Sequence, residues 1–194
     1  MNELFEQPDD ATPLTPEEMR ELIPAHIAYR SELNEAEQEN ISRAQDWALN
    51  RRRDPLSERF VKDLHRRMFG DVWRWAGKFR MSERNLGIPF HEIPVALRQL
   101  LDDTKAWIEY KTYPPDEIAV RFHHRLVQIH PFPNGNGRHA RLMADLLVMR
   151  LGGERFSWGR GSLRTAGAAR ARYVEALRAA DDHDIAPLLV FARV

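Results

Sequence analysis

The chain has 194 residues, a length typical of one domain, and should bury roughly 70% of the surface that its unfolded form exposes. Its 29 basic residues balance 29 acidic ones, so nucleic acid binding by bulk electrostatics is not expected. The absence of cysteine excludes disulfides and thiolate metal sites. Residues 1–10 lack a signal-peptide pattern, and no apolar run approaches the roughly 20 residues that span a bilayer. We therefore expect a soluble, cytoplasmic protein that does not contact membranes.

Helix signals dominate the first part of the chain. After a loose arm that ends at Leu14, Thr15 and the Pro-Glu-Glu that follows it form a good helix start, which predicts a helix to about Tyr29. Ser31 is expected to cap a second helix with apolar residues on one face. Ser57 is expected to open a third helix with a strongly apolar inner face.

The middle and the end of the chain complete a helical set. Residues 79–88 differ, because two short segments flank the polar tip Glu83-Arg84-Asn85 and predict a small hairpin. Apolar spacing and proline or glycine breaks predict further helices at 93–110, 114–129, 136–151, 165–180 and 185–192. The expected fold is all-α, a helical bundle with one small β-hairpin.

The segment 129–141 joins two of these helices and combines features suited to phosphate. Gly135-Asn136-Gly137 opens a helix, whose N–H groups and positive dipole end favour an anion, and glycine lets a ligand approach the backbone. Arg138 and Arg141 project from one side of this helix, and arginine grips phosphate as a fork. The segment therefore predicts a phosphate-binding loop that begins at His130.

His130 stands at the rim of this loop, before two prolines that stiffen the chain. Histidine is suited to taking a proton near neutral pH, and a positioned general base contributes roughly 10²–10⁴-fold in rate. The sequence thus predicts that His130 removes a proton from an incoming hydroxyl while the loop holds the phosphate under attack. Each feature alone would be assigned to a turn, but a turn needs at most one of these glycines and neither arginine.

The nine residues from His130 to Arg138 resemble the signature of the Fic family, His-Pro-Phe-x-Asp/Glu-Gly-Asn-Gly-Arg. The similarity extends over roughly residues 57–191: the segment from Trp75 to Ile88 resembles the lead into the family's flap hairpin and the flap itself, and residues 172–184 resemble its nucleotide-side helix. The resemblance divides the chain into an N-terminal arm and helices, residues 1–56, and a Fic core domain, residues 57–194. In detail the chain is similar to the bacterial subgroup called mobile mystery protein B, which suggests a small helix-turn-helix protein as a regulatory partner.

The resemblance implies a protein adenylyltransferase that transfers AMP from ATP, with Mg²⁺, to a Ser, Thr or Tyr hydroxyl of a target protein. It makes His130 the catalytic base and Phe132 the anchor that orients the loop. It assigns the nucleotide and its phosphates to Asn134, Gly135, Asn136, Gly137, Arg138, Arg141, Tyr173 and Asp181. It assigns target docking, by addition of a strand, to flap residues Arg80, Met81, Ser82, Leu86, Gly87 and Ile88.

Two positions depart from the family pattern. Asn134 stands where the family has an acid that binds Mg²⁺, and its uncharged carbonyl oxygen predicts weakened metal binding. Asp181 stands where relatives often carry Asn beside the nucleotide's base. The first departure leaves open a non-catalytic Fic module that binds nucleotide or a partner, although the intact His130 opposes it. A phosphotransferase or another nucleotidyl transferase on the same fold is a further alternative, and the intact Gly135 and Gly137 favour AMP transfer over phosphorylation.

A second motif concerns inhibition. Some Fic proteins carry an inhibitory helix with the pattern Ser/Thr-x-x-x-Glu-Gly/Asn, which the segment from Ser31 to Ala36 matches except at its last position. A Glu35–Arg141 pair would occupy the phosphate fork, and charge-assisted bonds of ~1.5–3 kcal/mol would lower ATP binding on the order of tenfold or more. The structural alternative makes Ser31 a helix cap and Glu35 an ordinary dipole partner in an acidic segment.

Several histidines raise the question of a metal site. Adjacent helical residues point about 100° apart, so His123 and His124 cannot easily bind the same ion, and a metal site that combines them with His130 and His139 is not expected. We expect one of the adjacent pair to pack and the other to be solvated, and we expect His65 to be a helix residue with a local bond.

Overall fold

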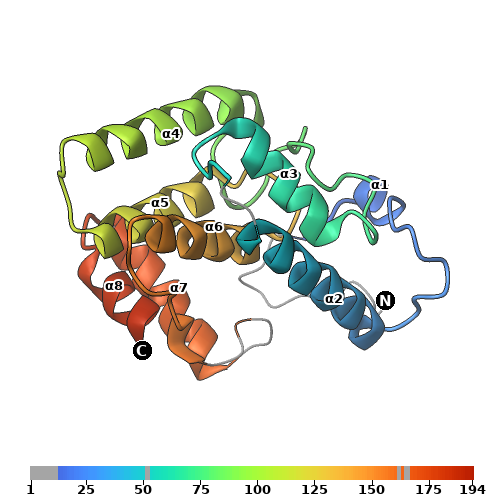
Figure 1. The fold of residues 1–194 in the computed structure, drawn as a ribbon. Helices are drawn as coiled ribbons and strands as arrows, with labels where there is room; N and C mark the ends of the chain where they lie inside the picture. Colours follow the sequence, from blue (N-terminus) through green and yellow to red (C-terminus); the bar gives the residue numbers. More distant parts are fainter. Residues whose placement is uncertain (1–12, 51–52, 161–162, 164–166) are drawn as a thin grey trace.

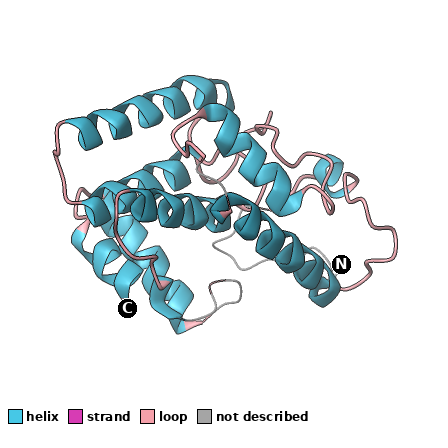
Figure 2. Cartoon of the chain, in the orientation of Figure 1, coloured by secondary structure: helices cyan, strands magenta, loops and turns pink. Residues whose placement is uncertain are grey.

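The computed structural model describes residues 13–50, 53–160, 163 and 167–194. Within these ranges the protein is a set of helices with no strand ladder (Figure 2), and one isolated antiparallel bridge joins Leu22 to Trp73. The expected all-α class is confirmed. None of the described helices has the length and apolarity needed to cross a bilayer. The predicted loose arm lies mostly outside the described residues.

The first helix, α1 (Pro16–Met19), is much shorter than predicted. Its start is as expected, because Thr15 and Glu18 form a reciprocal capping box. The predicted continuation to Tyr29 is wrong: Pro24 has no N–H to donate and disfavours helical backbone before it. The chain pairs instead with a distant segment, since Ile23 N–H donates to Val72 O at 2.9 Å.

The long helix α2 (Arg30–Leu49) begins one residue before Ser31, so Ser31 is not its cap. The N–H groups of the two residues before the helix are satisfied by Glu32, whose carboxylate accepts from Ala28 N at 2.8 Å and Tyr29 N at 3.0 Å. Glu32 reaches back over the helix start and replaces the serine in the capping role. Ser31 itself is exposed.

The remaining helices follow the predicted boundaries closely. They are α3 (Glu58–Phe69), α4 (Ile93–Glu109), α5 (Pro115–Ile129), α6 (Asn136–Arg150), α7 (Ala168–Asp181) and α8 (Ala186–Arg193). Ser57 caps α3 as predicted, with its hydroxyl accepting from Phe60 N at 3.3 Å. The predicted start of α7 at Thr165 lies outside the described residues.

Helices α5 and α6 pack against each other at the centre of the bundle (Figure 1). Helix α4 packs on α5, α2 packs along α3, and α8 contacts both α7 and α5. The loop between α5 and α6 is therefore held by the two most central helices. It is the loop that carries His130 and the glycines.

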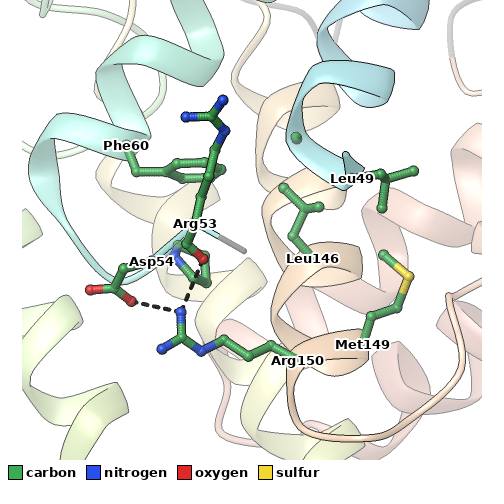
Figure 3. Close-up of a pocket in the computed structure, with 9 residues that line it drawn as sticks. Leu49, Arg53, Asp54, Phe60, Leu146, Met149 and Arg150 are labelled. Carbon is green, nitrogen blue, oxygen red and sulfur yellow. Dashed lines mark hydrogen bonds and ion pairs between the residues drawn. The ribbon is translucent and has the colours of Figure 1, made fainter. Parts of the chain in front are cut away.

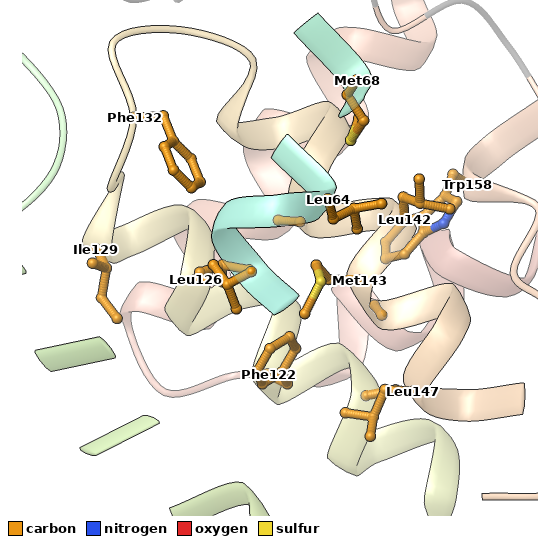
Figure 4. Close-up of a cluster of buried hydrophobic side chains, with 14 of the residues drawn as sticks. Leu64, Met68, Phe122, Leu126, Ile129, Phe132, Leu142, Met143, Leu147 and Trp158 are labelled. Carbon is orange, nitrogen blue, oxygen red and sulfur yellow. The ribbon is translucent and has the colours of Figure 1, made fainter. Parts of the chain in front are cut away.

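The hydrophobic core runs up to this loop (Figure 4). Leu64 and Met68 of α3, Leu126 of α5 and Met143 of α6 are buried there, and Phe132 of the loop is also fully buried. Burial of a side chain of this size contributes roughly 1.5–3 kcal/mol, so Phe132 anchors the loop as strongly as a core residue anchors a helix. Packing of Phe132 in the core thus fixes the position of the loop.

The predicted hairpin at 79–88 is not formed, because this segment contains no paired strand. Its two arms are joined through the buried guanidinium of Arg80, which donates to the carbonyls of Ser82 (2.9 Å) and Ile88. Within the polar tip, Arg84 turns inward and pairs with Glu18 of α1, whereas Glu83 and Asn85 are exposed. Two arginine side chains hold the segment, which we call the flap (residues 79–88), in place of cross-strand hydrogen bonds.

Candidate active site

His130 follows the last residue of α5 and has left-handed backbone angles, φ 54° and ψ 60°. Such angles in a residue other than glycine cost on the order of 1–3 kcal/mol and cluster at functional sites. Core packing of Phe132 and a 2.7 Å bond from Arg80 Nε to His130 O support the strained residue from both sides. These backbone angles at His130 turn the chain sharply from α5 into the loop.

The His130 imidazole is neutral at physiological pH. Burial lowers its pKa most, and the nearby positive charge of Arg80 lowers it further. A hydrogen bond with the Val127 backbone acts in the opposite direction, and the net pKa is about 4. A neutral imidazole has an unprotonated ring nitrogen, so His130 can accept a proton as a general base requires.

The loop that follows is held by its own side chains. Asn136 is buried, and its amide accepts from Phe132 N–H at 2.9 Å and donates to Phe132 O at 2.8 Å. The Asn136 side chain therefore secures the loop, and only its backbone N–H can take the anion-binding role expected of it. These two hydrogen bonds close the loop between Phe132 and Asn136.

Helix α6 begins at the end of this loop, after Gly135. Gly135 has φ 80°, and a Cβ atom at this position would lie 2.5 Å from the Phe69 ring, so no other residue fits without displacement. The N–H groups of the first helical turn have no acceptor within the helix. With the positive end of the helix dipole they form a site for an anion, as the sequence predicted.

Arg138 lies on this first turn, and its guanidinium bridges two groups. Nη1 is 2.5 Å from Glu37 Oε2, and Nη2 is 3.4 Å from Asn134 Oδ1. Glu37 is a buried residue of α2 that also accepts from Trp73 Nε1 at 2.8 Å. Burial raises the Glu37 pKa, but the charge and hydrogen bonds of Arg138 and the Trp73 bond outweigh burial and lower it. Glu37 is therefore ionised and holds the fork expected to bind phosphate.

Asn134, expected to be a weak Mg²⁺ ligand, turns its side chain back onto the loop. Its Oδ1 accepts from Gly135 N–H at 2.7 Å and also lies near the Arg138 fork. The described residues include no group of three or more His, Asp or Glu side chains that could hold a metal ion. One neutral oxygen already shared by two donors does not fit a Mg²⁺ ion held by the chain itself, because Mg²⁺ demands near-ideal octahedral oxygen ligation.

Arg141 lies three residues further on α6, with its guanidinium 5.3 Å from the centre of the Tyr173 ring. Tyr173 is buried behind it, with its hydroxyl 3.1 Å from His123 Nε2. Tyr173, expected to bind nucleotide, thus supports Arg141 from below. Among the described residues the predicted Glu35–Arg141 pair is not formed, because Glu35 is exposed and the α2 carboxylate that reaches the loop is that of Glu37.

Asp181 lies at the end of α7, where its carboxylate is half exposed. It is 2.8 Å from His124 Nε2 and 3.4 Å from Gln128 Nε2. His124 is partly exposed and His123 is fully buried, as expected for adjacent helical residues. Asp181 therefore contacts the C-terminal part of α5, the helix that precedes His130.

The flap covers His130. Gly87 has φ 97°, and a Cβ atom there would lie 2.6 Å from the Cβ atom of His130. Of the residues expected to dock a target, Met81 and Leu86 are exposed, whereas Arg80 is buried under the loop. The Arg80 side chain cannot reach a target and serves instead as the link between flap and loop.

The sequence patterns did not indicate two residues that hold the loop, Glu37 and His65. Glu37 lies on the buried face of α2 with Leu33, Asn40 and Ala44. A carboxylate on the apolar face of a helix is the sequence signal that could have indicated its role. His65 is not locally bonded as expected: its Nε2 lies 3.0 Å from Asn134 O, 69 positions along the chain.

A cavity of about 690 Å³ lies elsewhere, between the C-terminal ends of α2 and α6 (Figure 3). Its lining includes Leu49, Phe60 and Met149, and Arg150 closes one side by donating to Arg53 O and Asp54 Oδ1. Met149 is 13 residues beyond the start of α6, so the cavity is roughly 20 Å from the phosphate-binding turn. It is separate from the site around His130.

Comparisons with known proteins agree with this geometry. Residues 55–148 match the Fic/DOC family. Protein adenylyltransferase Fic of Aedes aegypti is 30% identical over 147 residues, which are 74% of this chain and 28% of that protein. The chain spans about a quarter of the length of the curated relatives that it matches.

Solved structures share the helical arrangement. A Fic-1 fragment from Caenorhabditis elegans has a TM-score of 0.63 and 26% identity, covering 81% of this chain and 48% of that chain. An N-terminal Fic domain from Bartonella quintana with bound ADP has a TM-score of 0.63 and 19% identity, covering 87% of this chain and 86% of that chain. With its His130 loop between two central helices, this chain belongs to the Fic/DOC family.

Proposed function

We propose that the chain is a protein adenylyltransferase, which transfers AMP from ATP to a hydroxyl group of a target protein. The observation that carries the proposal is the neutral imidazole of His130. His130 itself has left-handed backbone angles and lies directly before the loop that leads to the anion-binding start of α6. The curated relatives named protein adenylyltransferase support the same reaction. The bound ADP of the Bartonella quintana domain supports a nucleotide at this site.

In the proposed reaction the target hydroxyl gives its proton to His130 as its oxygen attacks the α-phosphorus of ATP. A phosphorus–oxygen bond forms to the target, and the bond from the α-phosphorus to the bridging oxygen breaks, releasing pyrophosphate. The N–H groups at the start of α6 stabilise the negative charge on the phosphate oxygens. Arg141, supported by Tyr173, assists at the polyphosphate. The proton then leaves His130 for water.

Mg²⁺ commonly accompanies ATP, and when bound it neutralises phosphate charge. The residues of the chain carry each step, because the donor set at Asn134 does not fit a resident ion. The part of the flap between Ser82 and Ile88 is the proposed docking strip for the target backbone. Its exposed Leu86 and the neighbouring Met81 offer apolar contacts to the target beside His130.

The ion pair between Glu37 and Arg138 suggests regulation. A carboxylate on the phosphate fork competes with ATP, so a partner that draws α2 away would raise activity. The small helix-turn-helix protein that the resemblance to the mobile mystery protein B subgroup implies is a candidate for that partner. In this proposal Glu37 takes the inhibitory role that the motif assigned to Glu35.

The test uses ATP labelled at the α- or the γ-phosphate, incubated with a cell extract and either the protein or its His130→Ala variant. We expect α-label on a protein with the native chain and none with the variant. Transfer of γ-label would establish a phosphotransferase instead. ADP binding without transfer of either label would establish a non-catalytic module. Mass spectrometry of the labelled protein then identifies the modified side chain.

A further inference from the structure

We propose that His65 is a positioning residue, which fixes the peptide plane between Asn134 and Gly135 so that the Gly135 N–H faces the bound phosphate. The inference rests on the proposed nucleotide-binding function and extends it to a residue outside the signature loop. His65 belongs to α3 and is fully buried. It makes no contact with solvent and takes no part in proton transfer.

The imidazole of His65 connects two segments. Its Nε2 lies 3.0 Å from Asn134 O in the loop, and its Nδ1 accepts from Gly77 N–H at 3.0 Å, just before the flap. The ring also stacks on Phe132 with 3.7 Å between ring centres. One side chain therefore touches the loop backbone, the loop anchor and the base of the flap.

The proton position on this ring follows from its partners. Nδ1 accepts a hydrogen bond from Gly77 N–H and is therefore unprotonated. Nε2 faces the Asn134 carbonyl, which can only accept, so Nε2 carries the proton. Burial lowers the pKa of His65 well below its ordinary value, and the neighbouring His139 and Arg138 act in the same direction. The ring is thus neutral with a single tautomer, and Nε2–H donates to Asn134.

The consequence for the loop comes from peptide geometry. In a trans peptide the C=O and N–H bonds point in opposite directions, so holding Asn134 O against α3 turns Gly135 N–H away from it. On that side, Gly135 N–H and Arg138 Nη2 both approach one oxygen, Asn134 Oδ1. The two donors converge where a phosphate oxygen would bind, and the Asn134 amide oxygen takes that place in this structure.

His139 provides a matched comparison. It is also fully buried, its Nε2–H donates to a carbonyl (Val61 O, 3.0 Å), and its ring packs edge-on against Phe132. Its acceptor belongs to α3 and lies outside the phosphate loop. Replacing His139 therefore removes similar packing and one similar hydrogen bond without releasing the Asn134–Gly135 peptide.

The experiment measures ADP binding by calorimetry for the native chain and for His65→Leu, His65→Gln and His139→Leu, with thermal unfolding as a control for folding. Loss of one oriented hydrogen bond predicts that His65→Leu weakens ADP binding about five- to tenfold. The Gln side chain can present an N–H at the position of Nε2, so His65→Gln should recover most of that loss. His139→Leu should unfold at a lower temperature yet bind ADP within about twofold of the native chain. With ATP, the KM of His65→Leu should rise by more than its kcat falls.

Equal losses of ADP affinity in His65→Leu and His139→Leu, or no recovery in His65→Gln, would overturn the proposal. Should His65→Leu not fold, ¹⁵N spectra of the native imidazole decide, because a proton on Nδ1 contradicts the proposed bond to Asn134. The outcome is separate from that of the proposed function. A native chain that binds ADP but labels no protein refutes AMP transfer alone, while AMP transfer with unchanged ADP affinity in His65→Leu refutes only the role of His65.

Discussion

Glu37 and Arg138, 101 positions apart in the chain, form an ion pair in which the carboxylate is almost fully buried. The pair joins α2 to the phosphate-binding turn of α6, and Trp73 donates to the second carboxylate oxygen. A buried ion pair is weak evidence for stability, because desolvation offsets the attraction. Because Arg138 is predicted to bind phosphate, the ion pair instead affects nucleotide binding.

Replacing Glu37 by Gln should strengthen nucleotide binding while weakening the fold. The amide can still accept from Trp73 but no longer holds Arg138 by charge, which releases the fork for phosphate. We expect ADP affinity to rise on the order of tenfold and the free energy of unfolding to fall by roughly 1–3 kcal/mol. Calorimetry with ADP and urea unfolding measure the two effects. Glu35→Gln is the matched control, since Glu35 is exposed on the same helix and should change neither. Unchanged ADP binding in Glu37→Gln would reject the inhibitory role.

The pH profile of AMP transfer should reflect the lowered pKa of His130. A general base works only when unprotonated, so activity falls as pH drops through its pKa. With a pKa of about 4, kcat/KM should stay level from pH 8 down to roughly 5.5 and fall below that value. An acid limb centred at the ordinary histidine pKa of roughly 6.5 would contradict the proposed burial effect. Stability measured over the same range separates loss of the base from unfolding.

The buried histidines should make the fold sensitive to acid. Burial lowers the pKa of His65, His123 and His139, with His139 at about 3. The unfolded chain takes up protons near pH 6.5 that the folded chain refuses, so their contribution is complete above that pH and is lost as pH falls toward the folded pKa values. Each such group lowers the free energy of unfolding by up to about 1.4 kcal/mol per pH unit in that window. Urea unfolding at pH 7, 6 and 5 should show the decline, and His139→Gln should reduce its slope.

Asn134→Asp should restore a metal ligand. The carboxylate would add a charged oxygen beside the start of α6, and Mg²⁺ prefers such ligands together with phosphate oxygens. We expect AMP transfer by the variant to reach half its maximum at a lower Mg²⁺ concentration than transfer by the native chain. A titration of Mg²⁺ at saturating ATP measures this. Identical titrations for the two proteins would show that position 134 does not contact the ion.

Much of the molecule could be predicted because it depends on neighbouring residues. Apolar spacing, caps and breaks predicted α3 to α6 and α8 nearly to their ends, and the residues from His130 to Arg138 indicated a phosphate loop. The helix predicted from Thr15 to Tyr29 ends at Met19, and Pro24, which is itself a local signal, is incompatible with the longer helix. The predicted hairpin is absent for another reason. The flap carbonyls of Ser82 and Ile88 accept hydrogen bonds from the buried Arg80 side chain and not from a facing strand.

The helices and the chemistry of one loop follow from local sequence, because residues a few positions apart set helical periodicity and turn geometry. The groups that contact this loop from other helices depend on long-range packing. The acidic segment of α2 offers Glu32, Glu35, Glu37 and Glu39, and only the angle at which α2 packs selects Glu37 to face Arg138. Likewise the fold brings His65 to a carbonyl 69 positions away. Packing of complete helices sets these contacts, and no local pattern encodes the rotation of one helix against another.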